Sequence, residues 1–318
     1  MAKREFLKNR YDKIFEEVQR QVQQAHTQTL NRQDLIKKIE KRMGVKLLVY
    51  VSKLNYPIDY NDIHIIGSML ESIGDTDNIS LLIQSGGGVG TVAEKIVEMI
   101  RHYCKEKTFT VVVPNVAKSA ATMIALGADE IIMGVTSELG PIDPQMQIIQ
   151  GGVPHWISAQ SFIDARYRLE ALTKDAIVKN EPYQPDIAQL SAINSGFIDY
   201  CEKSISFAKD FTIKYLQKFM LKKLNDAHSL AESIANDLTS ASKYFTHGRT
   251  ISARAIKDNP PLDKLNVQEL PKESDEWKML FELYLRSELY LDMDNQPHQR
   301  KGKLFEAAKF SMVTSFPA

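Results

Sequence analysis

The chain has 318 residues, 43% hydrophobic and 25% charged, which is enough apolar content to bury the core of one large domain. Lys and Arg together number 40, as do Asp and Glu, so no overall basic field favours a nucleic-acid partner. Two cysteines are too few for a disulfide framework, and the N-terminus lacks the apolar core of a signal peptide. We therefore expect a cytoplasmic protein with no membrane span, no metal and no other cofactor.

The N-terminal 45 residues are predicted to be helical. Apolar residues recur at helical spacing from Leu7 to Val22, and a second helical piece follows from Leu35 to Met43. An apolar stripe needs a surface to pack on. Residues 1–45 are therefore interpreted as an N-terminal helical extension that forms either a domain of its own or a contact between subunits.

Short apolar strands alternate with helices from residue 46 onward. Strands are expected at 47–51, 79–83, 108–113 and 130–133, and helices at 61–73, 92–103 and 119–126. This alternation is typical of parallel strands with helices covering both faces of the sheet. We therefore predict an α/β domain over residues 46–258.

The later part of the chain is predicted to be mainly helical. Prolines interrupt residues 146–185, which show a mixed pattern. A long helical stretch is expected at 186–223, a turn with a short strand at 244–256, and a final helix at 277–291. Residues 259–318 are therefore interpreted as a C-terminal helical extension.

Three consecutive glycines, Gly86-Gly87-Gly88, close the second predicted strand and precede a helix. Glycine permits close backbone approach and positive φ, so the N–H groups of such a turn can converge on one point. The turn could cradle a phosphate, supply half of an oxyanion hole, or simply redirect the chain. The spacing does not match the dinucleotide fingerprint, and the lysine of a P-loop is absent, which weakens the phosphate alternative.

Ser119 stands between the strand predicted at 108–113 and a short apolar helix that opens with Ala120 and Ala121. A serine in this place often does no more than cap the helix. A hydroxyl at a helix N-terminus beside free N–H groups is also what acyl transfer requires, provided that a base is in reach.

The run VPNVAKSAATMIALGADEIIM, followed by LGPIDPQ, resembles the serine dehydrogenase proteinase family. That family is related to signal peptide peptidase A and, more distantly, to the proteolytic subunit of Clp protease. The similarity is strongest over residues 79–145 and weaker through 186–256. It implies a Clp/crotonase-like fold of repeated β-β-α units with a parallel sheet. It also implies a serine endopeptidase that acts on peptide or protein substrates and assembles as a homo-oligomer.

The resemblance also implies roles for individual residues. Ser119 matches the nucleophile, and the N–H groups of Gly87 and Ala120 match the oxyanion donors, with Gly86 beside them. The family usually carries Pro-Gly-Gly where this chain has Ser85-Gly86-Gly87, and Ser-Gly-Gly where it has Ser119-Ala120-Ala121. Neither change removes a backbone donor.

The general base is left open between a lysine and a histidine. Signal peptide peptidases use a lysine, and burial must lower the pKa of such a lysine for it to be neutral near pH 7. Lys203 matches a family lysine and is the first candidate. Lys118 adjoins the nucleophile, and Lys174 lies in a poorly matching segment.

His247 is the alternative base, because it falls close to the position at which Clp protease supplies its acidic residue. His155 is a further histidine after the Asp143 loop. Asp143 itself lies near the position of the Clp protease histidine, and it would either orient a base or stiffen the turn.

Two other functions stay open. The chain could be a catalytically inactive relative, a scaffold or peptide-binding protein that works through its terminal helical regions. It could instead be an acyl-CoA enzyme of the crotonase branch, which does not need a serine in this turn.

Overall fold

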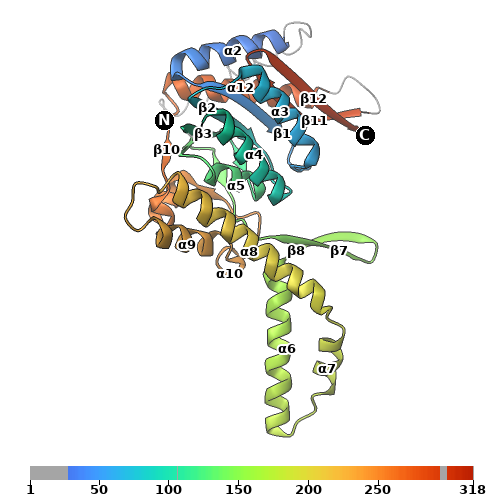
Figure 1. The fold of residues 1–318 in the computed structure, drawn as a ribbon. Helices are drawn as coiled ribbons and strands as arrows, with labels where there is room; N and C mark the ends of the chain where they lie inside the picture. Colours follow the sequence, from blue (N-terminus) through green and yellow to red (C-terminus); the bar gives the residue numbers. More distant parts are fainter. Residues whose placement is uncertain (1–27, 106, 294–298, 318) are drawn as a thin grey trace, which may run out of the picture.

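The computed structural model describes residues 28–105, 107–293 and 299–317 (Figure 1). The predicted helix from Leu7 to Val22 lies outside the described residues. The chain forms an α/β body, from which a long helical arm projects at one end (Figure 1). Among the described residues, no helix combines the length and the apolar character needed to cross a membrane.

A seven-stranded sheet forms the centre of the body, in the order β10-β5-β3-β2-β1-β11-β12. Its strands are β1 (Lys46–Ser52), β2 (Asn78–Gln84), β3 (Thr108–Val113), β5 (Glu130–Met133), β10 (Val267–Glu269), β11 (Gln299–Ala307) and β12 (Phe310–Pro317). The strands from β10 to β1 run parallel to one another, whereas β11 and β12 are antiparallel to their neighbours. The largely parallel sheet predicted from the sequence is therefore confirmed.

Helices bury both faces of this sheet. On one face lie α3 (Tyr60–Ile73), α4 (Gly90–Tyr103) and α5 (Ala120–Leu126), and on the other α2 (Gln28–Met43) and α12 (Asp275–Asp292). Leu48 and Tyr50 of β1 belong to the first layer, while Leu47 and Val49 contact the second. Burial on both sides explains why the strands are continuous apolar runs rather than alternating ones. Helix α2 thus packs on the sheet of its own chain.

The interpretation of residues 259–318 as a helical extension is wrong in part. Helix α12 forms where it was expected, but residues 299–317 are the hairpin of β11 and β12, which extends the sheet beyond β1. The hairpin was not predicted because β11 contains charged residues, which are unusual in a buried strand. The charges are buried because each has a partner: Lys303 Nζ lies 2.8 Å from Asp62 Oδ1, and Arg32 Nε lies 2.7 Å from Glu306 Oε2.

The arm consists of α6 (Ala159–Lys179), α7 (Gln184–Ser191) and the first part of α8 (Ser195–Lys218) (Figure 1). The hairpin of β7 (Gln145–Gln150) and β8 (Val153–Ser158) leads into it. Helix α6 was not predicted, because it buries only Ala159, Ile163, Thr173 and Ala176 and so lacks a broad apolar stripe. The single helix expected at 186–223 is broken at Asn194, whose side chain caps α8.

A second, three-stranded sheet lies beyond the carboxyl ends of the central strands, and we call it the small sheet. Its order is β4-β6-β9, from β4 (Val116–Ala117), β6 (Glu138–Leu139) and β9 (Ile251–Ser252). The remaining elements are α9 (Ala227–Leu238), α10 (Ala241–Tyr244), α11 (Ala253–Asp258) and the 3₁₀ turn η1 (Leu262–Lys264). A backbone bridge between Ser85 and Ala117 joins the small sheet to the end of β2.

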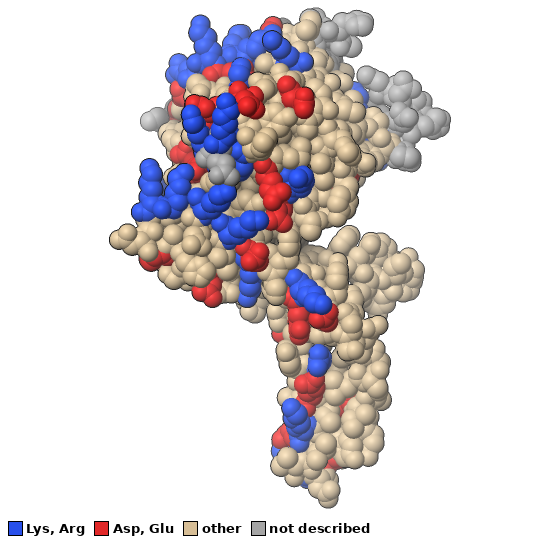
Figure 2. Space-filling view, viewed as in Figure 1, with Lys and Arg blue, Asp and Glu red and all other residues tan. Residues whose placement is uncertain are grey.

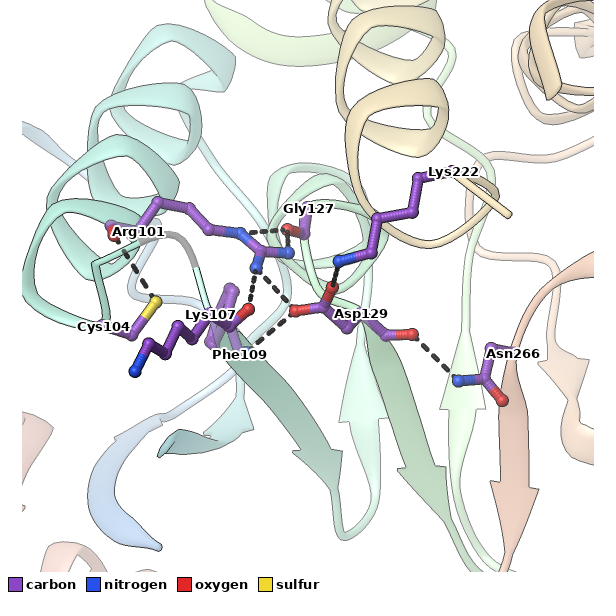
Figure 3. A network of polar contacts seen from close by, with 8 residues as sticks. All are labelled: Arg101, Cys104, Lys107, Phe109, Gly127, Asp129, Lys222 and Asn266. Carbon is purple, nitrogen blue, oxygen red and sulfur yellow. Dashed lines mark hydrogen bonds and ion pairs between the residues drawn. The ribbon is translucent and has the colours of Figure 1, made fainter. Parts of the chain in front are cut away.

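At the opposite end of the central sheet, Arg101 ties several elements together (Figure 3). Its guanidinium donates to the Gly127 carbonyl at 2.6 Å and to the Asp129 carboxylate at 2.6 Å. The same carboxylate accepts from the Phe109 N–H at 2.9 Å, and the guanidinium lies 3.5 Å from the ring centre of Phe219. This network fixes the ends of α4 and α5 to the first residues of β3 and β5.

The surface around this network carries charges of both signs. Lys and Arg side chains gather over the upper left of the face in Figure 2, interspersed with Asp and Glu. Lys105, Lys214 and Lys218 line a groove there together with Asp75 and Glu98. Arg101 lines this groove too, so its charged lining consists of four cations and two carboxylates.

Glu288 in α12 is expected to make the protein less stable as the pH rises. Burial raises the pKa of its carboxyl from 4.5 to about 7, and the nearby Asp292 adds to the shift while Lys53 opposes it. The native state therefore holds this proton more tightly than the unfolded chain. Its stabilising contribution is complete below about pH 4.5 and is lost as the pH rises through 7.

Because the carboxyl is only partly shielded from water, the expected loss in free energy of unfolding is on the order of 1–2 kcal/mol between pH 5 and 8. Urea unfolding at both pH values measures it. Glu288→Gln should abolish this pH dependence, and the surface control Glu273→Gln should retain it. An equal pH slope in the Glu288→Gln variant would contradict the assignment.

Candidate active site

Ser119 immediately precedes α5, and its backbone adopts a conformation that is uncommon for a residue with a side chain. Its φ is 50° and its ψ is −117°, and its side chain makes no capping hydrogen bond to the helix. The hydroxyl is therefore not used as a helix cap. Strained backbone of this kind costs about 1–3 kcal/mol and persists only where the surrounding structure enforces it, most often at functional sites.

Gly87 packs directly against Ser119. Its φ is +103°, and a Cβ placed on it would lie 2.6 Å from the Ser119 Cβ and 3.3 Å from the Ala120 nitrogen. No side chain fits in that space, and the positive φ would strain one in any case. The end of β2 and the turn before α5 can therefore meet only because glycine occupies this position.

The amides offered by the glycine turn differ from the prediction. The Gly87 N–H donates to Ser85 Oγ at 3.1 Å, so it is already engaged and is not free to bind an oxyanion. Gly86 packs on the Leu54 carbonyl rather than on Ser119. Within the described part of the chain, the N–H groups of Gly88 and Ala120 have no acceptor. Ala120 directly follows Ser119, and Gly88 directly follows Gly87, so both N–H groups are candidate oxyanion donors.

Asp143 and His247 come together from segments far apart in the sequence. The Nδ1 atom of His247 lies 2.7 Å from Asp143 Oδ1, and the Asp143 side chain is only 4% exposed. The other carboxylate oxygen accepts from Gln145 Nε2 at 3.0 Å. An imidazole held through Nδ1 in this way presents Nε2 as a proton acceptor. The other histidine considered, His155, lies exposed on β8.

The small sheet joins the segments that carry Ser119, Asp143 and His247. Strand β4 ends just before Ser119, β6 ends shortly before Asp143, and β9 begins shortly after His247. Strand β6 pairs with both of the others. In addition, Thr122 in the first turn of α5 accepts from the Gly140 N–H at 3.1 Å, which fixes the Asp143 loop to that helix.

The lysines considered as bases lack the required setting. The Lys203 side chain is 74% exposed, and its Nζ lies 2.7 Å from the carboxylate of Asp199. It therefore does not have the burial on which its choice as first candidate depended. Lys174 is also exposed. Lys118 is buried, and this burial lowers its pKa, but Glu138 opposes the shift and backbone carbonyls occupy the ammonium.

Sequence reasoning left out three groups that belong to this arrangement: the Gly88 N–H, Gln145 and Glu138. Gln145 and Glu138 flank the run Leu139 to Pro144, so the motif itself was the available signal. The motif carried no information about where the side chains of Gln145 and Glu138 point. Among the described residues, no group of three or more His, Cys, Asp or Glu side chains is arranged to hold a metal ion.

The model of one protein family matches most of the chain. It describes a ClpP-like SDH-type serine proteinase and covers residues 14–289. With the mixed α/β architecture and largely parallel sheet described above, it confirms the ClpP/crotonase-like fold class predicted from the sequence.

Individual relatives are more distant. An uncharacterized protein of Methanocaldococcus jannaschii, MJ1495, is 29% identical over 236 residues, which cover 70% of this chain and 68% of that protein. A second from the same organism, MJ0137, is 41% identical over 68 residues, which cover 21% of this chain and 23% of that one.

Two solved structures of variants of the 1510-N membrane-bound stomatin-specific protease are also similar. One is 20% identical and covers 45% of this chain and 69% of its own, with a TM-score of 0.28. The other, in complex with a substrate peptide, is 16% identical. The match covers 75% of this chain and 98% of that structure's chain, also with a TM-score of 0.28. A score of that size does not define corresponding residues.

Gly87→Ala is expected to disable the site. The added methyl would collide with the Ser119 Cβ, which must move by several tenths of an ångström or more. Since a displacement of about 1 Å can cost roughly 100-fold in rate, we expect at least that loss in the labelling of Ser119 by a fluorophosphonate.

Gly44→Ala is the matched control. Gly44 also has a positive φ, of +69°, but nothing lies within 4 Å of a Cβ placed there. Both variants should lose similar backbone stability, about 1 kcal/mol each, while only Gly87→Ala loses labelling. Equal labelling rates in the two variants would show that the contact with Ser119 is unimportant.

Proposed function

Because the chain belongs to the ClpP-like SDH-type serine proteinases, we propose that it hydrolyses peptide bonds through an acyl-enzyme formed on Ser119. The observation that carries the proposal is the hydrogen-bonded pair of Asp143 and His247. In the small sheet, β6, which precedes Asp143, pairs with β4, which leads into Ser119, and with β9, which follows His247. A nucleophile, a base and a group that orients the base are the components of serine-protease chemistry.

In the proposed reaction, Ser119 Oγ attacks the peptide carbonyl while His247 Nε2 takes the hydroxyl proton. The N–H groups of Gly88 and Ala120 bind the negative oxygen of the tetrahedral intermediate. His247 then gives its proton to the leaving amine, and the acyl-enzyme remains. Water, deprotonated by His247, attacks that ester. As the bond to Ser119 Oγ breaks and the second product leaves, His247 gives the proton back to Ser119 Oγ.

Asp143 has two parts in this scheme. By accepting from Nδ1 it keeps the imidazole in the tautomer whose Nε2 is free, and its charge stabilises the imidazolium that forms. The hydrogen bond from Gln145 holds the carboxylate in place. By the resemblance to Clp protease, Asp143 lies near the histidine position and His247 near the acidic one. The proposal therefore exchanges the two residue types between positions and keeps the pair.

Self-association is the second part of the proposal. Large apolar side chains are exposed on the β7–β8 hairpin and the arm, among them Ile149 at 78%, Trp156 at 64% and Val178 at 84%. Exposed apolar surface of this kind marks contacts between proteins. We propose a homo-oligomer that contacts through these elements. The cytoplasmic location expected from the sequence stays a prediction.

Labelling with a fluorophosphonate probe tests the proposed nucleophile. The wild-type protein should be labelled, and Ser119→Ala should not be. Ser158→Ala is the matched control, since Ser158 also precedes a helix without capping it. Mass spectrometry of the labelled peptide identifies the modified residue. An unlabelled wild type, or unchanged labelling of Ser119→Ala, would end the proposal.

Substitution of the proposed base and its partner should slow turnover of casein or a peptide library. Asp143→Asn is expected to lower kcat by roughly 10³- to 10⁴-fold with little change in KM, because an amide favours the wrong imidazole tautomer. His247→Gln should have an effect at least as large. Asp164→Asn and His228→Gln alter exposed residues elsewhere and should be neutral. If His247→Gln kept a tenth of the activity, the base would have to be another group.

A further inference from the structure

Lys118 has its ammonium enclosed within the protein. Its side chain is 11% exposed, and Nζ lies 3.1 Å from Glu138 Oε1. The ammonium also donates to the carbonyl oxygens of Leu139 at 3.0 Å, Arg249 at 3.1 Å and Gly248 at 3.5 Å. An ammonium has three donors and no acceptor, so these oxygens satisfy it fully.

The three carbonyls border the proposed catalytic residues. Leu139 is the last residue of β6, from which the chain continues into the Asp143 loop. Gly248 and Arg249 directly follow His247 and lead into β9. Lys118 itself directly precedes Ser119. One cation therefore contacts, through backbone oxygens, the segments on which all three residues stand.

The His247 segment has few other attachments near this point. The N–H groups of Gly248 and Arg249 bond only to Thr246, within the same turn. Residues 248–250 are exposed, so apolar packing contributes little there. The bonds from the Lys118 ammonium are charge-assisted, and such bonds are about twice as strong as neutral ones. They are the main polar link between this segment and the strand before the nucleophile.

The path of the Lys118 side chain is closely packed as well. A Cβ placed on Gly140 would lie 2.5 Å from the Lys118 Cδ, so the aliphatic stem crosses directly over that glycine. Burial lowers the pKa of the ammonium and the hydrogen bond with Glu138 raises it. The carboxylate therefore helps to keep the buried group charged.

We propose that Lys118 is a positioning residue of the active site, whose ammonium holds the Asp143 and His247 segments in register with Ser119. This inference rests on the proposed function, since it assigns Lys118 to the geometry of that catalytic group. In this role Lys118 acts through the Asp143 and His247 segments and not on the substrate itself. Its removal should loosen the Asp143–His247 hydrogen bond while the fold remains.

The test compares Lys118→Met with Lys118→Arg in the full-length chain. Lys222→Met is the control, because it removes another ammonium that pairs with a carboxylate, Asp129, at the opposite end of the sheet. The first readout is the downfield NMR signal of the His247 Nδ1 proton, assigned by its loss in His247→Gln. The others are the rate of fluorophosphonate labelling and the thermal unfolding midpoint.

In Lys118→Met we expect the imidazole signal to disappear and labelling to slow by about 100-fold, as a displacement near 1 Å would cause. In Lys118→Arg, which keeps a charged donor, labelling should stay within about tenfold of wild type. Lys222→Met should keep both signal and rate. A folded Lys118→Met that retains them would overturn the inference, as would an arginine variant no better than the methionine one.

If Lys118→Met does not fold, Lys118→Gln gives the same comparison, because glutamine keeps N–H donors but is too short to reach all three carbonyls. The two proposals fail differently. No labelling of the wild type contradicts the proposed function, whereas normal labelling and an unchanged imidazole signal in the folded Lys118 variants contradict the positioning role alone.

Discussion

The small sheet is the constraint on which the rest of the site depends. Its strands are only two residues long, too short to be stable alone, so neighbouring elements must hold them. Ala117, Leu139 and Ile251 pair in one row across the sheet, and all three are buried in the main apolar core. Ser85 links this row to β2, accepting from the Lys118 N–H at 3.1 Å. The central sheet and its core therefore hold the small sheet, and with it the candidate site, in a fixed position.

The strained turn at Ser119 depends on the same support. A positive φ at a serine is unfavourable, and the compensation lies in α5, all of whose residues are buried. On the other side of the turn, Gly87 lies so close to Ser119 that a side chain at position 87 would collide with it. The helix and the glycine turn together therefore fix the hydroxyl at the end of the parallel strands, where active sites of α/β proteins are commonly found.

The sequence predicted those features that depend on local pattern, and missed those that depend on distant partners. Continuous apolar runs identified the parallel strands, and the motif around Ser119 identified the fold and suggested the proposed nucleophile. The hairpin of β11 and β12 was missed because Lys303 and Glu306 look solvent-exposed until their partners on α3 and α2 are known. Sequence similarity alone suggested Lys203 as the base. A matching position in the sequence carries no information about burial, and the Lys203 side chain is exposed.

The charges around Ser119 favour the proposed pair of a histidine and a carboxylate over a lysine as the base. The buried ammonium of Lys118 already places a positive charge next to Ser119 in the chain, and Glu138 balances it at 3.1 Å. A second cation, formed when the base takes the serine proton, would be unfavourable there unless it also had a partner. Asp143 is such a partner for His247, so in the proposed reaction the proton could pass from Ser119 to His247 without leaving an unpaired charge.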